Sequence, residues 1–139
     1  RCTTEQMSRY QARLSGPLLD RLDLRVAVQP VPLSALAAEA VAGESSAVVR
    51  ARVCARRARQ QARQGYANAC LPGHELSQML TPAVTRFAQA AGERLGLSAR
   101  AYHRVLRVAR TVADLALAEG IDSAHVAEAL CYRGSVLTD

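Results

Sequence analysis

The chain has 139 residues and a net charge of +6 at pH 7, and half of its residues are hydrophobic. This length fits a single domain that has enough apolar residues to bury a core. All 18 basic residues are arginine. Because the phosphate-binding P-loop needs a lysine, the composition excludes a self-sufficient P-loop ATPase. The basic balance favours partners that carry phosphate or acidic groups.

Large aromatic side chains are scarce, with no Trp and one Phe in the whole chain. The core must therefore be built from Ala, Leu and Val. Alanine-rich packing with few β-branched runs indicates helices. The composition thus predicts a mainly α fold.

Neither a metal site nor a membrane span is predicted. The cysteines and histidines lack the spacing of zinc ligands, and no apolar run is long enough to cross a bilayer. Without a signal peptide, a reducing cytoplasmic compartment is expected. Because the chain begins with Arg1 rather than Met, we expect it to be a piece of a longer protein. The cysteines and histidines are Cys2, Cys54, Cys70, Cys131, His74, His103 and His125.

The first third of the chain predicts short helices and one strand. Residues 4–14 and 18–22 carry helical patterns that Ser15-Gly16-Pro17 separates. Apolar and polar residues alternate over 22–28, which is the pattern of a β-strand. A single strand cannot form a sheet, so its partners are expected outside this chain. Residues 33–42 predict a short alanine-rich helix.

A long basic helix is predicted from about residue 46 to 63. Four of its arginines recur at helical spacing, with Arg50 and Arg57 nearby and no acidic residue among them. One interpretation is a solvated helix face. Because like charges at this spacing repel, a contact surface for nucleic acid or an acidic neighbouring subunit is an equal alternative. The four arginines are Arg52, Arg56, Arg59 and Arg63.

The helix at 98–115 has the strongest amphipathic pattern in the chain. Ser98 is a good N-cap, and apolar residues from Tyr102 to Ala113 recur at helical spacing. A second face carries Arg100, Arg104 and Arg107. These arginines predict either a solvated face or an anion site, because a guanidinium group suits phosphate oxygens.

Further helices are predicted at 74–80, from Pro82 to Leu95, and at 124–132. Gly96 ends the second of these, and Asp122 or Ser123 caps the third. With the helices at 46–63 and 98–115, they predict a bundle of four or five helices.

Three stretches together resemble the C-terminal part of the magnesium-chelatase-like AAA+ ATPases. They are Leu14-Ser-Gly-Pro-Leu-Leu-Asp-Arg-Leu-Asp23, Gly43-Glu-Ser-Ser46 and the helix at 97–115. They occur in the family's order and span nearly the whole chain. The resemblance implies the end of an αβα ATPase core at 1–31, a linker at 32–45 and a helical lid bundle at 46–139.

Arg21 lies in the motif that resembles the arginine finger of the related MCM helicases. The resemblance implies that Arg21 reaches into the ATP site of the next subunit. There it would neutralise the charge that develops on the γ-phosphate. A structural salt bridge with Asp20 or Asp23 is the alternative, and the two roles are compatible.

The helix at 98–115 resembles the sensor-2 helix of the same family. Arg100 matches the sensor arginine best, and Arg104 and Arg107 are weaker candidates. The Walker A and Walker B motifs are absent, so this chain is not expected to hydrolyse ATP by itself. ATP and magnesium are expected as cofactors of a full-length parent, with none in this part. Cys2 could end a cysteine cluster in such a parent, but its partners are missing here.

The resemblance implies one module of a ring-forming, homo-hexameric, ATP-driven DNA motor. Such a motor is a helicase that migrates branched DNA during natural transformation, with single-stranded or branched DNA as its partner. Two alternatives remain open. The bundle could be a DNA-binding domain in its own right, or it could belong to a chelatase subunit that serves magnesium insertion into a porphyrin.

Overall fold

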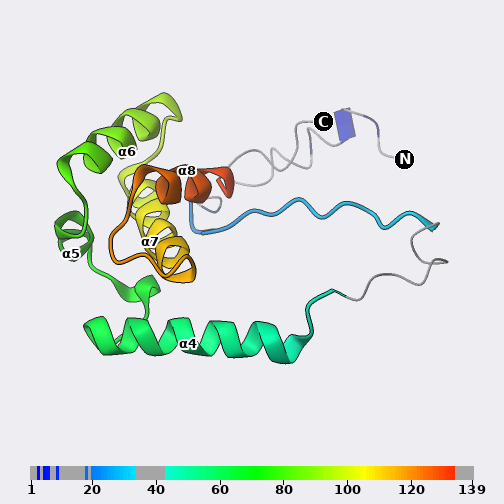
Figure 1. Ribbon diagram of the computed structural model, residues 1–139. Helices are drawn as coiled ribbons and strands as arrows, with labels where there is room; N and C mark the ends of the chain where they lie inside the picture. Colours follow the sequence, from blue (N-terminus) through cyan, green and yellow to red (C-terminus); the bar gives the residue numbers. More distant parts are fainter. Residues whose placement is uncertain are drawn as a thin grey trace.

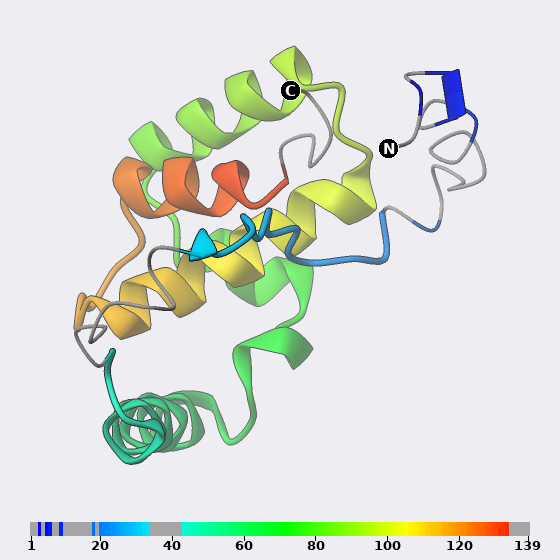
Figure 2. The same cartoon turned by 90° about the vertical axis from the view of Figure 1, so that its right-hand side faces the viewer.

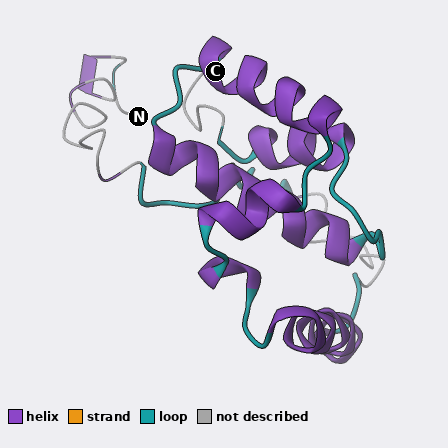
Figure 3. Cartoon of the chain, turned by 90° about the vertical axis from the view of Figure 1, so that its left-hand side faces the viewer, coloured by secondary structure: helices purple, strands orange, loops and turns teal. Residues whose placement is uncertain are grey.

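The computed structural model describes residues 20–33 and 43–133, together with residues 3, 5, 6, 9 and 18. Helices dominate these residues, and no β-strand occurs among them (Figure 3). The mainly α fold predicted from composition is therefore confirmed. The helices are α4 (Ser46–Gln64), the short 3₁₀ helix η1 (Asn68–Cys70), α5 (Gly73–Gln78), α6 (Pro82–Arg94), α7 (Ala99–Leu115) and α8 (Ser123–Cys131) (Figure 1).

The helix starts follow local side-chain chemistry. The Ser98 hydroxyl accepts a hydrogen bond from the Ala101 amide at 3.2 Å, which satisfies a first-turn N–H of α7. Similar caps start the other long helices. They are Ser45 for α4, Thr81 for α6 and Asp122 for α8. At the other end of α4, Gly65 adopts a left-handed conformation with φ of 79°, which glycine tolerates best.

The central element is α7, which contacts α4, η1, α5 and α8 (Figures 1 and 2). Its buried apolar face packs against α8 and α6 and forms the core. The buried apolar cluster consists of Leu71, Leu76, Val84, Ala88, Val105, Leu106, Ala109, Ala113, Ile121, Val126 and Ala129. The predicted apolar stripe of this helix is thus the side that holds the bundle together.

The short helix α5 approaches α7 very closely at Gly73. A Cβ atom at this position would lie 2.8 Å from Cε1 of His103. Glycine leaves room here for the imidazole ring, because a Cβ atom would require the His103 side chain to shift.

Helix α4 lies apart from the other helices and touches α7 through its C-terminal half (Figures 1 and 2). Its N-terminal half is exposed, including apolar residues such as Val48 and Val53, which are 53% and 54% exposed. The helix is therefore docked at one end and has no neighbour among the described residues at the other.

Residues 22–28 were expected to form a strand whose partners lie outside this chain. The segment starts near the end of α8 and runs extended away from the bundle (Figure 1), without a strand partner among the described residues. One backbone hydrogen bond holds it, from the Arg25 amide to the Tyr132 carbonyl at 2.8 Å. Because strand hydrogen bonds need a neighbouring strand, alternation alone does not produce a sheet here.

The other predicted N-terminal elements are described only at single residues. Glu5, Gln6 and Arg9 are helical, as are Leu18 and Leu33. Asp20 and Arg21 form a turn rather than the end of a helix at 18–22. The rest of the predicted helices at 4–14 and 33–42 lies outside the described residues. None of the described helices combines the length and apolar character needed to span a membrane.

Candidate functional site

The segment Asp20 to Asp23 lies against the start of α7, so the structure brings two of the sequence motifs together. The Ser98 hydroxyl donates to Oδ2 of Asp20 at 2.7 Å. Arg104 donates from Nη1 to Oδ1 of Asp23 at 2.6 Å and to the carbonyl of Arg21. These contacts join residues about 80 positions apart in the chain. The junction is therefore a tertiary site.

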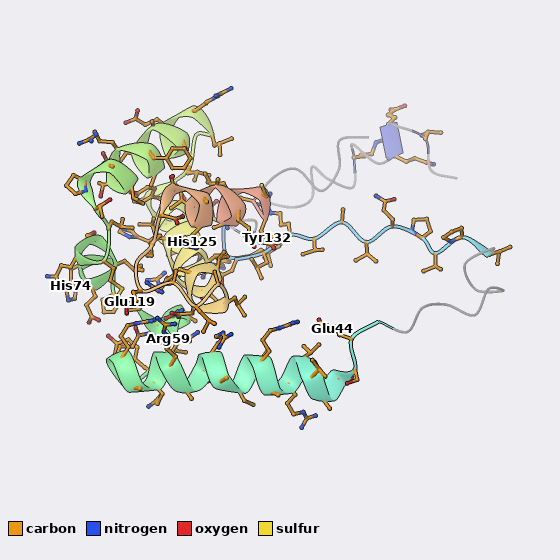
Figure 4. All side chains as sticks on the ribbon, in the orientation of Figure 1. Glu44, Arg59, His74, Glu119, His125 and Tyr132 are labelled. Atoms are coloured by element: carbon orange, nitrogen blue, oxygen red, sulfur yellow. The ribbon has the colours of Figure 1, made fainter. Side chains whose placement is uncertain are left out.

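A second arginine, Arg133, holds the same segment from the end of α8. Its Nη1 donates to the Leu22 carbonyl, and its Nη2 lies 3.7 Å from Oδ1 of Asp20. The side chain is only 5% exposed, and this burial lowers the pKa of Arg133, as does the nearby charge of Arg25. Tyr132, the neighbour of Arg133, lies next to the extended segment (Figure 4).

Arg21 itself is exposed, and its side chain makes no hydrogen bond or ion pair with the described part of the chain. The two acids that flank it have other partners. Asp20 is bound by Ser98 and Arg133, and Asp23 by Arg104. The guanidinium group of Arg21 is thus left available for a ligand outside this chain.

The three arginines of α7 that were predicted as nucleotide sensors have different environments. Arg100 is exposed, and its side chain has no partner among residues 20–33 and 43–133. Arg104 donates hydrogen bonds to the Arg21 carbonyl and the Asp23 carboxylate. Arg107 donates from Nε to the Leu71 carbonyl at 2.8 Å. Arg104 and Arg107 also line an open hollow of about 230 Å³ between the extended segment, η1 and α7.

A buried polar cluster fixes the C-terminal half of α4 to α7. Its centre is Asp114, whose side chain is fully buried. Arg63 donates to both carboxylate oxygens, at 2.6 and 3.0 Å. Asn68 donates to the same carboxylate at 2.7 Å, and Arg110 does so at 2.9 Å. Every oxygen of this buried charge is therefore satisfied several times.

The cluster shifts the ionisation of its members. Burial alone would raise the pKa of Asp114. Hydrogen bonds from Arg63 and Asn68 outweigh burial, and the charge of Arg110 acts in the same direction, so the pKa of this carboxyl lies below its usual value. Burial lowers the pKa of Arg110. At neutral pH the carboxylate is charged and binds two guanidinium groups.

The basic row predicted on α4 does not form one outward face. Arg63 points to Asp114, and Arg59 donates to the Ala118 carbonyl at 3.1 Å in the space between α4 and the end of α7 (Figure 4). Arg52 pairs with Glu44 through two bonds of 2.8 Å. Arg56 is half-buried, and its Nε has no partner among the described residues. The four arginines at this spacing therefore have different partners: Arg59 and Arg63 contact the end of α7 and the residues after it, and Arg52 binds Glu44.

Sequence reasoning missed four residues that build these sites. Asp114, Asn68 and Arg110 belong to the buried cluster, and Arg133 holds the extended segment. Asp114 and Arg110 are four residues apart, a spacing that predicts an ion pair within a helix. No local pattern marks the contact of Asn68 with Asp114 or the contacts of Arg133, because these residues are distant in the sequence.

Two family profiles match the chain. The one described as the C-terminal domain of the magnesium chelatase subunit ChlI matches residues 43–133. The one described as the magnesium chelatase subunit ChlI matches residues 1–36. The helical bundle is thus the C-terminal domain of this family.

Similar proteins occur in several bacteria. The uncharacterized protein YifB of Salmonella typhimurium is 46% identical over 135 residues, 96% of this chain. The competence protein ComM of Haemophilus influenzae is 44% identical over 138 residues, 98% of this chain. An uncharacterized protein of Mycobacterium tuberculosis H37Rv is 41% identical over 142 residues, 95% of this chain. The chain spans 27% of the length of each of these relatives.

Proposed function

We propose, because the chain belongs to the magnesium chelatase ChlI family of AAA+ proteins, that it is the lid module of a ring-forming, ATP-driven DNA motor. In this proposal residues 1–31 end the ATPase core, residues 32–45 are a linker, and the bundle is the lid. The motor is a hexameric helicase that migrates branched DNA. The relative named as a competence protein, similar over nearly the whole chain, supports a role on DNA rather than on a porphyrin.

The chemical role of the module centres on Arg21. The observation that carries the proposal is that Asp20 and Asp23 bind other groups, which leaves the Arg21 guanidinium exposed and unpaired in the described structure. In a ring, Arg21 would reach the ATP of the next subunit and stabilise the charge on the γ-phosphate in the transition state. ATP and its magnesium ion are held by the Walker motifs of that subunit, which this chain lacks.

Arg100 is the second phosphate ligand in this proposal. Its side chain has no partner among the described residues, and it lies one helical turn before Arg104, which binds the backbone of Arg21. The backbone positions of Arg21 and Arg100 are therefore close together on one surface of the protein. Arg104 and Arg107 are engaged by backbone and carboxylate groups, so we assign them to building the site, with sensing of the nucleotide as the alternative.

The test is an Arg21→Ala substitution in the full-length protein that carries this chain. ATP binding should remain, and hydrolysis should fall by about 10³-fold or more, as for other arginine fingers. Arg86→Ala is the matched control, because Arg86 is an exposed arginine on α6 without a side-chain partner in the described structure. Hydrolysis at the wild-type rate in the Arg21 variant would refute the proposal.

A second candidate function is DNA binding by α4. The helix carries no acidic residue, and two of its exposed arginines, Arg50 in the N-terminal half and Arg57 just past the middle, have no side-chain partner in the described structure. These two groups and Arg56 can contact phosphates without disturbing the fold.

A chelatase role is the remaining alternative. It predicts that ATP hydrolysis by the full-length protein supports metal insertion into a porphyrin and does not respond to DNA.

A further inference from the structure

Arg133 is a buried charge whose polar contacts lead to one short segment. Within the described residues, its guanidinium group reaches the Leu22 carbonyl and the carboxylate of Asp20. Both partners belong to the turn that carries Arg21, and they lie on either side of it. The contact spans 111 positions of the sequence.

Helix α8 has no need of this arginine for its own structure. It starts with a reciprocal cap between Asp122 and His125, and Val126 and Ala129 pack it into the core. Burying a guanidinium group is costly unless its hydrogen bonds are satisfied. The free-energy cost of burying the Arg133 guanidinium is offset by its contacts with the Leu22 carbonyl and the Asp20 carboxylate. These contacts hold the turn that carries Arg21.

The backbone around Arg21 is held on two sides. Arg133 binds the residues before and after Arg21. On the side of α7, Arg104 binds the Arg21 carbonyl, and Ser98 binds Asp20. The side chain of Arg21 remains exposed between these anchors. The main chain of this turn is thus fixed to the bundle, while the guanidinium group is free.

We propose that Arg133 is a positioning residue for Arg21, which it attaches to the end of α8. The inference rests on the proposed role of Arg21 at the ATP site of a neighbouring subunit. Arg21 then moves with the helical bundle rather than as part of a separate loop. A movement of the bundle in one subunit therefore moves Arg21 relative to the γ-phosphate of the ATP that the next subunit binds.

The size of the effect follows from the need for accurate placement. A displacement of about 1 Å can lower the rate of a reaction by about 10²-fold. We expect Arg133→Met, which keeps the length and removes the donors, to lower kcat by about 10- to 100-fold. The KM for ATP should stay within about twofold of wild type, because Arg133 touches no nucleotide. Arg133→Lys should recover part of the rate, since lysine can still reach one acceptor.

The decisive readout is the backbone amide of Arg25, which donates to the Tyr132 carbonyl. Hydrogen exchange at this amide in the 139-residue chain should become faster in Arg133→Met, while buried α7 amides such as that of Leu106 keep their protection. Arg86→Met is the control for both measurements. Should Arg133→Met destabilise the whole bundle, Asp20→Asn weakens the same contact from the exposed side, and it should speed Arg25 exchange and lower kcat.

The outcomes separate this inference from the proposed function. A lower kcat together with local release of Arg25 supports the inference. Wild-type kcat in Arg133→Met, or a lower kcat with unchanged Arg25 exchange in both Arg133→Met and Asp20→Asn, overturns it while the role of Arg21 stands. Wild-type kcat in Arg21→Ala overturns the proposed function, and the role of Arg133 in catalysis falls with it, even if Arg25 exchange changes.

Discussion

Arg63 of α4 and Asp114 of α7 form a bidentate ion pair, with distances of 2.6 and 3.0 Å, across 51 positions of the sequence. The Asp114 side chain is fully buried, whereas the Arg63 side chain is 25% exposed. Helix α4 contacts the bundle near this pair, whereas its N-terminal half is exposed. The buried carboxylate of Asp114 therefore helps to fix the position of the long basic helix, together with the hydrogen bond from Arg59 to the Ala118 carbonyl.

Removing that charge should destabilise the protein strongly. Asp114→Ala leaves Arg63 and Arg110 without their carboxylate, and loss of one partner of a buried pair costs about 3–5 kcal/mol. Chemical denaturation followed by circular dichroism measures the free energy of unfolding. Glu44→Gln is the control, because its pair with Arg52 is exposed, and it should leave the denaturation midpoint unchanged. Equal midpoints for Asp114→Ala and wild type would show that the cluster does not hold α4.

The same carboxylate predicts a pH dependence of stability. The pKa of Asp114 in the folded protein lies below its ordinary value of 3.8, so folding favours the charged form. Its contribution is fully present above the ordinary pKa and is lost as the pH falls below 3.8 and through the lower folded value. The free energy of unfolding should therefore fall as the pH drops below the ordinary pKa of 3.8, and less steeply in Asp114→Asn. Identical slopes in the two proteins would contradict this assignment.

Gly73 should not tolerate a methyl group. Gly73→Ala brings Cβ within 2.8 Å of the His103 ring, and overpacking of this kind costs about 1–3 kcal/mol. In a His103→Ala background the cost should largely disappear, because the ring is gone. Gly120→Ala is the control, since a Cβ there meets no atom within 4 Å. Thermal unfolding of the four variants measures the coupling, and equal costs in both backgrounds would refute the contact.

DNA binding, if α4 carries it, should depend on its free arginines. Arg50→Ala and Arg57→Ala should weaken binding and reduce the slope of log K against log salt by about 0.9 for each lost phosphate contact on duplex DNA. Fluorescence anisotropy of the 139-residue chain with single-stranded, duplex and branched DNA measures this. Arg94→Ala on α6 is the matched exposed control. If the chain does not bind DNA at low salt, these arginines belong to subunit contacts instead.

Much of the bundle could be predicted because its boundaries are set by neighbouring residues. Ser98 caps α7 and Gly65 ends α4, and both effects act within one helical turn. The predicted apolar stripe of α7 was also found in the core, because helical periodicity alone determines which side is apolar.

What could not be predicted depends on distant partners. Arg52 and Arg63 belong to one row at helical spacing on α4, yet Arg63 binds the buried Asp114 whereas Arg52 binds the exposed Glu44. The spacing does not reveal this difference, because it depends on which residue lies opposite each arginine. The strand expected at 22–28 has the right alternation but no neighbouring strand in the described structure. The role of Arg133 has no local signature, since its partners are more than 100 positions away.

Complementation between two inactive variants of the full-length protein tests the central claim most directly. One variant carries Arg21→Ala and keeps its nucleotide site, and the other keeps Arg21 and has a disabled Walker A motif. Neither variant should hydrolyse ATP alone. When they are mixed, rings that place an intact Arg21 next to an intact nucleotide site should recover ATP hydrolysis. If the mixed rings stay inactive, or if Arg21→Ala is active alone, Arg21 does not act across the subunit interface.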